Sequence, residues 1–131
     1  ICGSQGMPRP VASQPPLSLF KREACGELLP LCEKEKIATI PYQVLQSGLL
    51  SGKYHRGNIP VNSRAAEKPD WLKLDEATFA QLERFETEAK AQNQNLMQYA
   101  LAWALEQLSV VSLVLGVKSI GQLETLCKAI G

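Results

Sequence analysis

Apolar residues recur at helical spacing in the second half of the chain. After Asp75 they stand three or four residues apart, with charged residues between them, at Phe79, Leu82, Phe85 and Ala89. This spacing places them on one face of a helix, and an aspartate directly before a helix is a favoured cap for its free N–H groups. We predict a helix that begins after Asp75 and ends before the asparagines at positions 93 and 95.

Three further stretches are predicted to be helical. Residues 96–107 are apolar on nearly every side, which indicates a helix inside the core. An Asn95–Gln98 pair precedes this helix and a Ser119–Gln122 pair opens a last one, and both pairs are typical of a capping box. Near the amino terminus, the stretch from Gly26 to Lys36 predicts another helix, with Pro30 in its first turn.

Short β-branched stretches alternate with these helices. The stretches Ile37–Ile40 and Val110–Gly116 are uncharged, as strands buried on both faces are, and Pro10–Gln14 is a weaker candidate. The alternation implies parallel strands joined by right-handed crossovers. Residues 43–74, with three glycines and two prolines, predict a long loop of the kind that is usually functional or mobile.

About three parallel strands with flanking helices are available, whereas a (β/α)8 TIM barrel needs eight strands and roughly 250 residues. An open sheet of three strands leaves backbone groups unpaired at both edges. The chain starts at Ile1 rather than at a methionine. We therefore expect an α/β fold that is part of such a barrel, and we expect residues 1–131 to be a piece of a longer protein.

The composition excludes several classes of partner. The 131 residues are 45% hydrophobic and carry a net charge of +1, so neither nucleic acid nor an anionic membrane is expected to attract them. Residues 99–117 imitate a membrane span, but Glu106 near their centre would cost about 2.5–3.5 kcal/mol there. Helix-forming residues precede Glu106 and strand-forming residues follow it, so we predict two buried elements and no membrane span.

The sequence has few cysteine and histidine residues that could bind a metal or act in catalysis. Cys2, Cys25, Cys32 and Cys127 are irregularly spaced, and His55 is the one histidine of the sequence. A structural zinc ion needs about four clustered S or N ligands, so we predict no metal site. We interpret the cysteines as reduced thiols of a cytoplasmic protein rather than as a disulfide framework. His55 has no patterned partner, and we predict no catalytic role for it.

Candidate ligand contacts lie where the predicted strands end, because parallel α/β folds bind ligands beyond the carboxyl ends of their strands. This rule selects Gln14, the pair Tyr42–Gln43, and the turn Gly116–Ser119. In that turn, Lys118 and the free N–H groups of a helix capped by Ser119 suit an anion. A capped helix with a solvated lysine fits equally well. The Tyr42 ring could stack on a flat ligand or be a half-buried aromatic. The sequence does not decide between the two alternatives for the turn or between the two for Tyr42.

The stretch Gly48–Tyr54 superficially suggests a phosphate-binding P-loop. Three residues rather than four separate its glycines, and a tyrosine follows Lys53, so we reject that interpretation. We predict a turn with close backbone approach, with Lys53 and Arg64 as candidate phosphate contacts. The remaining large aromatic residues are predicted to be core: Trp71, Trp103, Phe79 and Phe85.

Several motifs occur in an order and spacing that resemble the C-terminal half of an aldo-keto reductase, a family that includes the potassium-channel beta subunits. The resemblance runs from about Pro10 to the end of the chain. It rests on residues 13–22 (SQPPLSLFKR), 27–32 (ELLPLC), 40–42 (IPY), 47–54 (SGLLSGKY), 63–64 (SR), 99–103 (YALAW), 115–116 (LG) and 122–124 (QLE).

The resemblance implies a barrel that transfers hydride between NADP(H), or NAD(H), and a small carbonyl or alcohol substrate. In family terms, Gln14 would hold the nicotinamide amide and Tyr42 would stack on the nicotinamide ring. Further implied contacts are Gln43, Leu45 and Lys53 along the pyrophosphate, and Arg64, Gly116, Lys118 and Gln122 around the adenosine end. Ser119 joins this set through the helix end that it caps.

The chain also departs from the family's pattern. The family's catalytic Asp, Tyr, Lys and His belong to its N-terminal half, so no catalytic residue is predicted here. Gln43 and Val44 replace the usual Ser and Pro, and Thr125 and Leu126 replace the Glu and Asn that usually close the adenine site. Weakened or lost cofactor binding is one outcome that these changes imply.

Two functions follow from the sequence. The first is the cofactor-binding C-terminal part of an NADP-dependent aldo-keto reductase, silent alone because it holds no acid to protonate the carbonyl oxygen. The alternative is a non-catalytic interaction or oligomerising module, whose open strand edges pair with another copy or with another protein. A second copy and the missing N-terminal half are both candidate partners of the chain. A small doubly wound nucleotide-binding domain is disfavoured because no G-x-G-x-x-G turn is present. The sequence does not indicate the physiological substrate.

Overall fold

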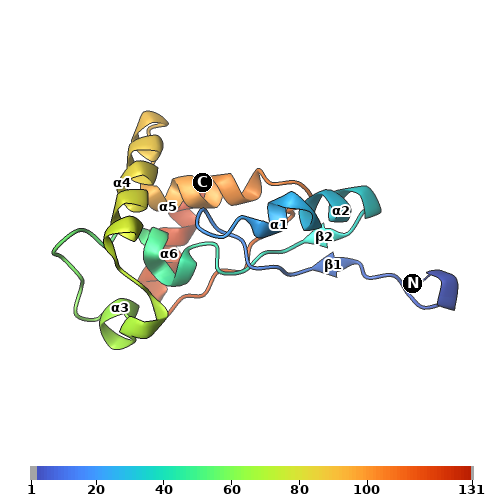
Figure 1. Ribbon diagram of the computed structural model, residues 1–131, viewed down its shortest axis with the longest axis horizontal. Coiled ribbons are helices and arrows are strands. Elements are labelled where there is room, and N and C mark those ends of the chain that lie inside the picture. Colours follow the sequence, from blue (N-terminus) through green and yellow to red (C-terminus); the bar gives the residue numbers. More distant parts are fainter. Residues whose placement is uncertain (1–2, 131) are drawn as a thin grey trace.

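The computed structural model describes residues 3–130 and shows an α/β arrangement (Figure 1). Two short strands pair in parallel, β1 (Ala12–Ser13) with β2 (Ala38–Thr39), and Ala12 lies opposite Ala38. The helices are α1 (Glu23–Gly26), α2 (Leu28–Glu35), α3 (Arg64–Glu67), α4 (Glu76–Ala91), α5 (Leu96–Leu105) and α6 (Ile120–Ile130). Three 3-10 helices complete the elements: η1 (Gly3–Gln5), η2 (Gln46–Ser51) and η3 (Pro69–Trp71).

The molecule is elongated, with a thick end and a narrow one. In Figure 1, helices α3 to α6 gather at the left, while β1, β2, α1 and α2 extend toward the amino terminus at the right. The narrow end therefore carries the parallel strands, and the thick end carries most of the helical packing.

The third predicted strand, Val110–Gly116, is wrong as a strand. This segment joins β2 through a single parallel bridge between Thr39 and Val110. The Val111 N–H donates to the Thr39 carbonyl (3.0 Å), and the Val114 N–H donates to the Pro41 carbonyl (2.9 Å). The physical reason is Pro41: the next bond of a regular parallel ladder would be donated by the N–H of residue 41, which a proline lacks, so the pairing stops after one bridge. The sheet therefore has two strands rather than three.

The predicted helix Gly26–Lys36 is two helices. The backbone breaks at Glu27 (φ −126°, ψ −45°), which ends α1 and begins α2. Pro30 lies in the first turn of α2, as predicted, where its missing N–H costs nothing. Helix α2 ends at Lys36 in the left-handed conformation (φ 56°), and β2 begins two residues later.

The predicted long loop, residues 43–74, contains three short helices, η2, α3 and η3. Each is too short to produce a helical period in the sequence, which is why the loop prediction missed them. Burial fixes η2 and α3, because Leu49 and Leu50 of η2 and Ala65 of α3 are nearly inaccessible to solvent. Ser63 caps α3 by accepting from the Ala66 N–H (3.4 Å).

The caps of the last three helices were largely predictable. Asp75 accepts from the Thr78 N–H at the start of α4 (2.9 Å), and both reciprocal bonds of the Asn95–Gln98 capping box are present at α5. At α6, Ser119 accepts from the Gln122 N–H (3.3 Å). The Gln122 side chain accepts from the Lys118 N–H (2.8 Å) rather than from that of Ser119, so this box is shifted by one residue.

Two clusters of buried side chains form the core. The larger one joins η2, the residues around Tyr54, α4 and the start of α5; it comprises Leu19, Leu49, Leu50, Tyr54, Ala65, Leu72, Leu82, Phe85, Leu96 and Ala100. The smaller one joins α5 to α6 and comprises Val44, Leu101, Ala104 and Leu126. Leu45 packs against both clusters, so the segment that follows β2 is anchored on two sides.

Acid should weaken the start of α4. Bonds from the Thr78 N–H and hydroxyl, and then the Lys73 ammonium, lower the pKa of Asp75 from 3.8 to about 2. Because the folded pKa is depressed, the stabilisation is complete above about pH 4 and is lost as the pH falls toward 2. We expect the melting temperature to fall over this window, as measured by circular dichroism. Asp75→Asn keeps the cap without a titrating group, and an equally steep fall in that variant would contradict the assignment.

Three thiols are unpaired in the structure, Cys25, Cys32 and Cys127, and Cys2 lies outside the described residues. Burial raises the pKa of the Cys25 thiol, with Arg22 opposing the shift. Within residues 3–130, no group of three or more His, Cys, Asp and Glu side chains is placed to hold a metal ion. In the same part of the chain, no helix combines the length and the apolar character needed to cross a membrane.

Candidate functional site

The carboxyl ends of the parallel segments lie side by side. The Tyr42 N–H donates to the Pro15 carbonyl (3.1 Å), which joins the end of β1 to the end of β2. The bond from Val114 to Pro41 joins β2 to the segment that leads toward Lys118. The carboxyl ends of the strands, where the sequence predicted ligand contacts, thus contain three stretches that are distant in the chain.

Gln14 and Tyr42 are exposed at this end. Tyr42 is 38% exposed although its backbone is bonded to Pro15, so part of its ring is free to meet a flat ligand. Val44, two residues later, is 1% exposed and fixes the segment in the smaller core cluster. Gln43 accepts a weak bond from the Lys21 ammonium (3.5 Å).

The segment after β2 has an unusual backbone. Left-handed conformations occur at Gln43 (φ 60°), Gln46 (46°), Ser47 (56°), Gly48 (91°) and Gly52 (78°). Non-glycine residues adopt this conformation at a cost of roughly 1–2 kcal/mol each, and such strain concentrates at ligand sites. A bond from the Ser18 hydroxyl to the Gln46 side chain (2.9 Å) and the burial of the leucines in η2 hold it in place.

Gly48 should tolerate no side chain. Its φ of +91° is strained for any L-residue, and an added Cβ would lie 3.4 Å from the Lys53 ammonium. We expect Gly48→Ala to destabilise the chain by about 1 kcal/mol or more in urea denaturation. Gly26→Ala is the matched control, because φ is not positive there and a Cβ would meet nothing within 4 Å. Equal stabilities of the two variants would contradict the strain at Gly48.

A pocket of about 250 Å³ lies beyond this segment. It is lined by Arg64, Glu67, Lys68, Trp71 and Lys118. The first four come from α3, η3 and the turn between them, and Lys118 arrives from the far end of the chain. The Arg64 guanidinium carbon lies 6.0 Å and the Lys68 ammonium 4.6 Å from the centre of the Trp71 ring.

The charges of the pocket favour an anion. Three cations face one carboxylate, and the Lys118 ammonium lies 3.4 Å from the Glu67 carboxylate. Both partners are more than half exposed, so this ion pair is weak and can be exchanged for another anion. The Trp71 ring adds a flat apolar surface beside the cations, a combination that suits a phosphate attached to an aromatic base.

Trp71 corrects one sequence prediction. It was expected in the core, but it is 66% exposed and carries two cations over its ring. The signal was available, because Lys68, Asp70 and Lys73 surround it without an apolar period. Glu67 and Lys68 were also missed as pocket residues, since nothing in the sequence shows that α3 and the Lys118 turn meet. Phe85 is buried, and Phe79 and Trp103 are partly buried, as predicted.

The predicted turn Gly116–Ser119 and the nearby Gln122 send one side chain into this pocket. Lys118 reaches it, while Ser119 and Gln122 use their side chains to cap α6. Gly116 is exposed in the turn itself. The structure therefore brings Arg64 and Lys118 together and leaves Gln43, Lys53 and Leu45 on the neighbouring segment.

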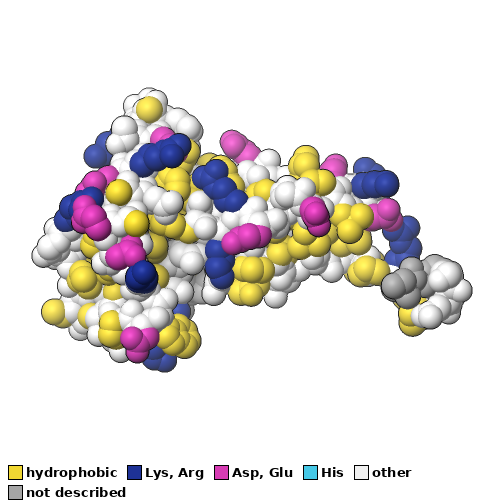
Figure 2. Space-filling view, in the orientation of Figure 1, with side chains coloured by type: hydrophobic (Ala, Val, Ile, Leu, Met, Phe, Trp, Pro, Cys, Tyr) yellow, Lys and Arg dark blue, Asp and Glu magenta, His cyan; other side chains and the backbone are white. Residues whose placement is uncertain are grey.

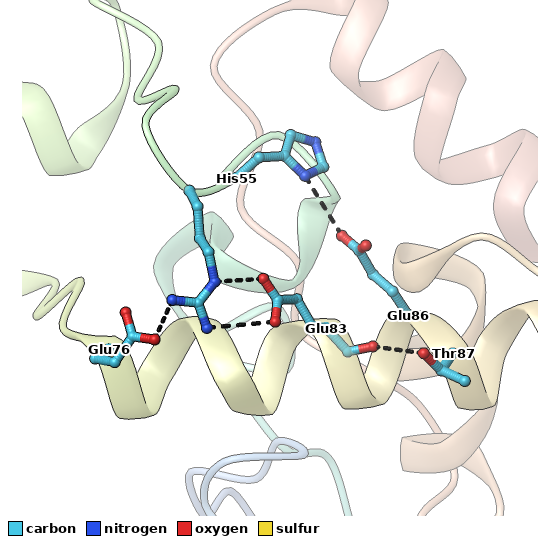
Figure 3. A network of polar contacts seen from close by, with 6 residues as sticks. His55, Glu76, Glu83, Glu86 and Thr87 are labelled. Atoms are coloured by element: carbon cyan, nitrogen blue, oxygen red, sulfur yellow. Dashed lines mark hydrogen bonds and ion pairs between the residues drawn. The ribbon is translucent and has the colours of Figure 1, made fainter.

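A set of ion pairs fixes the stretch between Lys53 and Arg64 on helix α4 (Figure 3). Arg56 contacts Glu76 and forms two bonds to the Glu83 carboxylate (2.5 and 3.3 Å). His55 lies 3.7 Å from Glu86, which gives it a partner on α4. Tyr54, directly before His55, is buried, and its hydroxyl accepts from a backbone N–H of α3 (3.4 Å). Lys53 and Arg64 are thus held at the two ends of an anchored stretch.

Parallel strands alternating with helices, with polar side chains at the carboxyl ends, define an α/β protein of the kind that binds ligands at that end. The model of the aldo/keto reductase family matches residues 3–130. The chain belongs to the aldo/keto reductase family.

The proteins that are similar to this chain are much longer than it. A probable voltage-gated potassium channel subunit beta of rice is 32% identical over 126 residues, which are 92% of this chain and 38% of that protein. Probable aldo-keto reductase 1 of soybean is 36% identical over 92 residues, 69% of this chain and 26% of its own. A solved glycerol dehydrogenase of Gluconobacter oxydans superposes with a TM-score of 0.73 at 31% identity, over 92% of this chain and 37% of its own. The chain spans less than two fifths of each.

Proposed function

We propose that this chain is the cofactor-binding C-terminal part of an NADP-dependent (β/α)8 barrel that reduces a small carbonyl compound. One observation carries the proposal: Arg64, Lys68 and Lys118 line a single pocket with Trp71, and Lys118 follows the extended segment that is bonded to Pro41 after β2. A nucleotide phosphate needs cations and an aromatic surface together, and family membership supplies the reaction class.

Each pocket residue is proposed to make a different contact with the phosphorylated end of NADP(H). The Arg64 guanidinium presents a planar fork of N–H donors, which matches two phosphate oxygens at once. Lys118 contributes a point charge from the opposite wall once Glu67 releases it. The Trp71 ring offers its face to the adenine base. NADP(H), when bound, supplies the hydride for the carbonyl carbon.

The other predicted contacts extend from the pocket along the ends of the parallel segments. Lys53, Leu45 and the left-handed backbone at Gln43 are proposed to face the pyrophosphate, and Gln14 and Tyr42 the nicotinamide. Leu126, which replaces a polar residue of the family's pattern, is 7% exposed and belongs to the smaller core cluster. Cofactor affinity therefore depends on the cations of the pocket more than on α6.

No side chain of this set is proposed to transfer a proton to the substrate. Reduction of a carbonyl requires an acid at the oxygen, and the resemblance locates that acid in the part of the family's barrel that this chain does not span. We expect the purified chain to bind NADPH without oxidising it in the presence of a simple aldehyde. Turnover that follows the chain through purification would contradict this assignment of roles.

The ion pair in the pocket should oppose cofactor binding. Glu67 holds the Lys118 ammonium at 3.4 Å and repels an incoming phosphate. An exposed pair of this kind is worth about 0.2–1 kcal/mol, so we expect Glu67→Gln to tighten NADPH binding by about 1.4- to five-fold at low salt. Isothermal titration measures the change. Glu124→Gln, on exposed α6 outside the pocket, is the control, and unchanged or weaker binding by Glu67→Gln would contradict the phosphate site.

Discrimination between the two cofactors tests the proposal as a whole. The cations of the pocket should stabilise bound NADPH more than bound NADH, because only NADPH carries the additional phosphate. We expect NADPH to quench tryptophan fluorescence at lower concentration than NADH. Equal or preferential binding of NADH would overturn the assignment of the pocket to that phosphate.

A further inference from the structure

A tight turn lies beside the segment that follows β2. In this turn the N–H groups of Ser18 and Lys21 each donate to the carbonyl of the other residue, at 2.9 and 3.0 Å. Ser18 is fully buried, and its hydroxyl accepts from the Lys21 N–H (3.1 Å) and donates to the Gln46 side chain (2.9 Å). The backbone that carries the Lys21 side chain is therefore fixed against the left-handed segment 43–48.

The Lys21 side chain ends at this segment. Its ammonium lies 3.5 Å from the side-chain oxygen of Gln43, and within residues 3–130 it forms no ion pair with a carboxylate. A contact of this length with a neutral amide is weak, so it orients the ammonium without neutralising its charge. The next cation, Arg22, is used differently: its Nε donates to the Leu19 carbonyl (3.0 Å), and its guanidinium lies 4.8 Å from the centre of the Trp103 ring.

Lys53 occupies the other end of the same segment. Its ammonium would lie 3.4 Å from a Cβ added at Gly48, and it lies 5.1 Å from the centre of the Tyr54 ring. Among the described residues, no carboxylate pairs with Lys53 either. Two ammonium groups without a carboxylate partner thus flank the segment, one at Gln43 and one at Gly48.

The backbone between the two ammonium groups also suits an anion. Leu45 (φ −90°, ψ 12°) is followed by two left-handed residues, Gln46 (φ 46°) and Ser47 (φ 56°). Successive N–H groups in a right-handed and then left-handed conformation form a concave anion site. Figure 2 shows basic and acidic side chains interspersed over the face in view, and the net charge of the chain is +1. Attraction of an anion therefore depends on local arrangements such as this one rather than on the whole surface.

We propose that Lys21 is a second cation for the pyrophosphate of the cofactor and acts together with Lys53. This role rests on the proposed function and adds a residue that neither the position of the strand ends nor the resemblance selected. A dinucleotide pyrophosphate carries two negative charges, which two flanking ammonium groups match. The Gln43 side chain, which replaces the usual serine of the family, supplies the oxygen that orients Lys21. Because NADPH and NADH share the pyrophosphate, Lys21 contributes equally to the binding of both.

Isothermal titration of Lys21→Gln with NADPH, NADH and 2′-AMP tests this role. We expect the variant to bind both cofactors about three- to ten-fold more weakly at low salt, by the same factor, and the difference from the wild type to narrow as the salt concentration rises. Binding of 2′-AMP should not change, because its phosphate reaches only the pocket lined by Arg64. Lys21→Arg keeps the charge and should retain most of the affinity.

The matched control is Lys34→Gln, which removes the same charge from an exposed position on α2 and should leave all three affinities unchanged. Equal affinities for both cofactors in Lys21→Gln and Lys34→Gln would overturn the role of Lys21 and leave the proposed function intact. A loss confined to NADPH would place Lys21 at the additional phosphate, and an equal loss in Lys21→Arg would assign the effect to packing of the turn; either result overturns the inference. If the wild-type chain binds neither cofactor, the proposed function fails and the role of Lys21 fails with it.

Discussion

Replacing Arg64 with alanine is expected to weaken NADPH binding by about ten- to a hundred-fold, because hydrogen bonds to charged groups are worth roughly 1.5–3 kcal/mol. Arg64 lines the pocket between α3 and Lys118 and is the one side chain there with a guanidinium fork. NADH lacks the additional phosphate, so its binding should weaken less. Isothermal titration of both cofactors measures the two losses.

The control for Arg64→Ala is Arg84→Ala. Arg84 is exposed on α4, where it pairs with Glu88 four residues later at 2.9 Å, and it lies outside the pocket. Removing it changes the net charge by the same amount. If the two variants weaken NADPH binding equally, the effect is one of overall charge and the pocket assignment is wrong.

Leu50→Ala is expected to cost about 2–5 kcal/mol of the free energy of unfolding, since the cavity left by a buried leucine closes only in part. Leu50 is fully buried in η2, and its N–H donates to the Leu45 carbonyl (3.2 Å). The larger core cluster thereby fixes the segment that carries Gly48 and Lys53. The loss is a large part of the 5–15 kcal/mol that stabilises an ordinary domain.

Urea denaturation measures this loss, and Leu31→Ala is its control. Leu31 is 53% exposed on α2, so its truncation removes little packing. A cost below about 1 kcal/mol for Leu50→Ala would mean that η2 is not held by the core. NADPH binding should weaken in parallel with stability in Leu50→Ala and remain unchanged in Leu31→Ala.

The long helices were predictable from the sequence because they combine a period with a cap. In α4, apolar residues repeat at helical spacing from Phe79 to Ala89 behind the Asp75 cap, and α5 follows a capping box. The strands were harder, since β1 and β2 have two residues each and their pairing depends on neighbours that no local pattern contains. Val110–Gly116 shows the limit: its β-branched composition predicts a strand, yet it forms one bridge because Pro41 on the neighbouring segment has no N–H to continue the ladder.

The candidate site also contains residues that the sequence predicted and residues that it did not. Lys118 was selected by the position rule, Arg64 was a candidate phosphate contact of the long loop, and the resemblance implied both. The structure places both in one pocket. Trp71, Lys68 and Glu67 were not selected, because only tertiary packing shows that α3 and η3 face the Lys118 turn. The charged residues Lys68, Asp70 and Lys73 around Trp71 were the available sign of a surface position.

The central claim is that the pocket between α3 and Lys118 binds the phosphorylated end of a dinucleotide. The chain contains two tryptophans, Trp71 in the pocket and Trp103 in the packing of α5, so their indole N–H signals report on two different places. Titration with 2′,5′-ADP, followed by nuclear magnetic resonance, is the direct test. The account predicts that the Trp71 signal shifts and the Trp103 signal does not. A stationary Trp71 signal at saturating ligand, or a shift confined to Trp103, would contradict it.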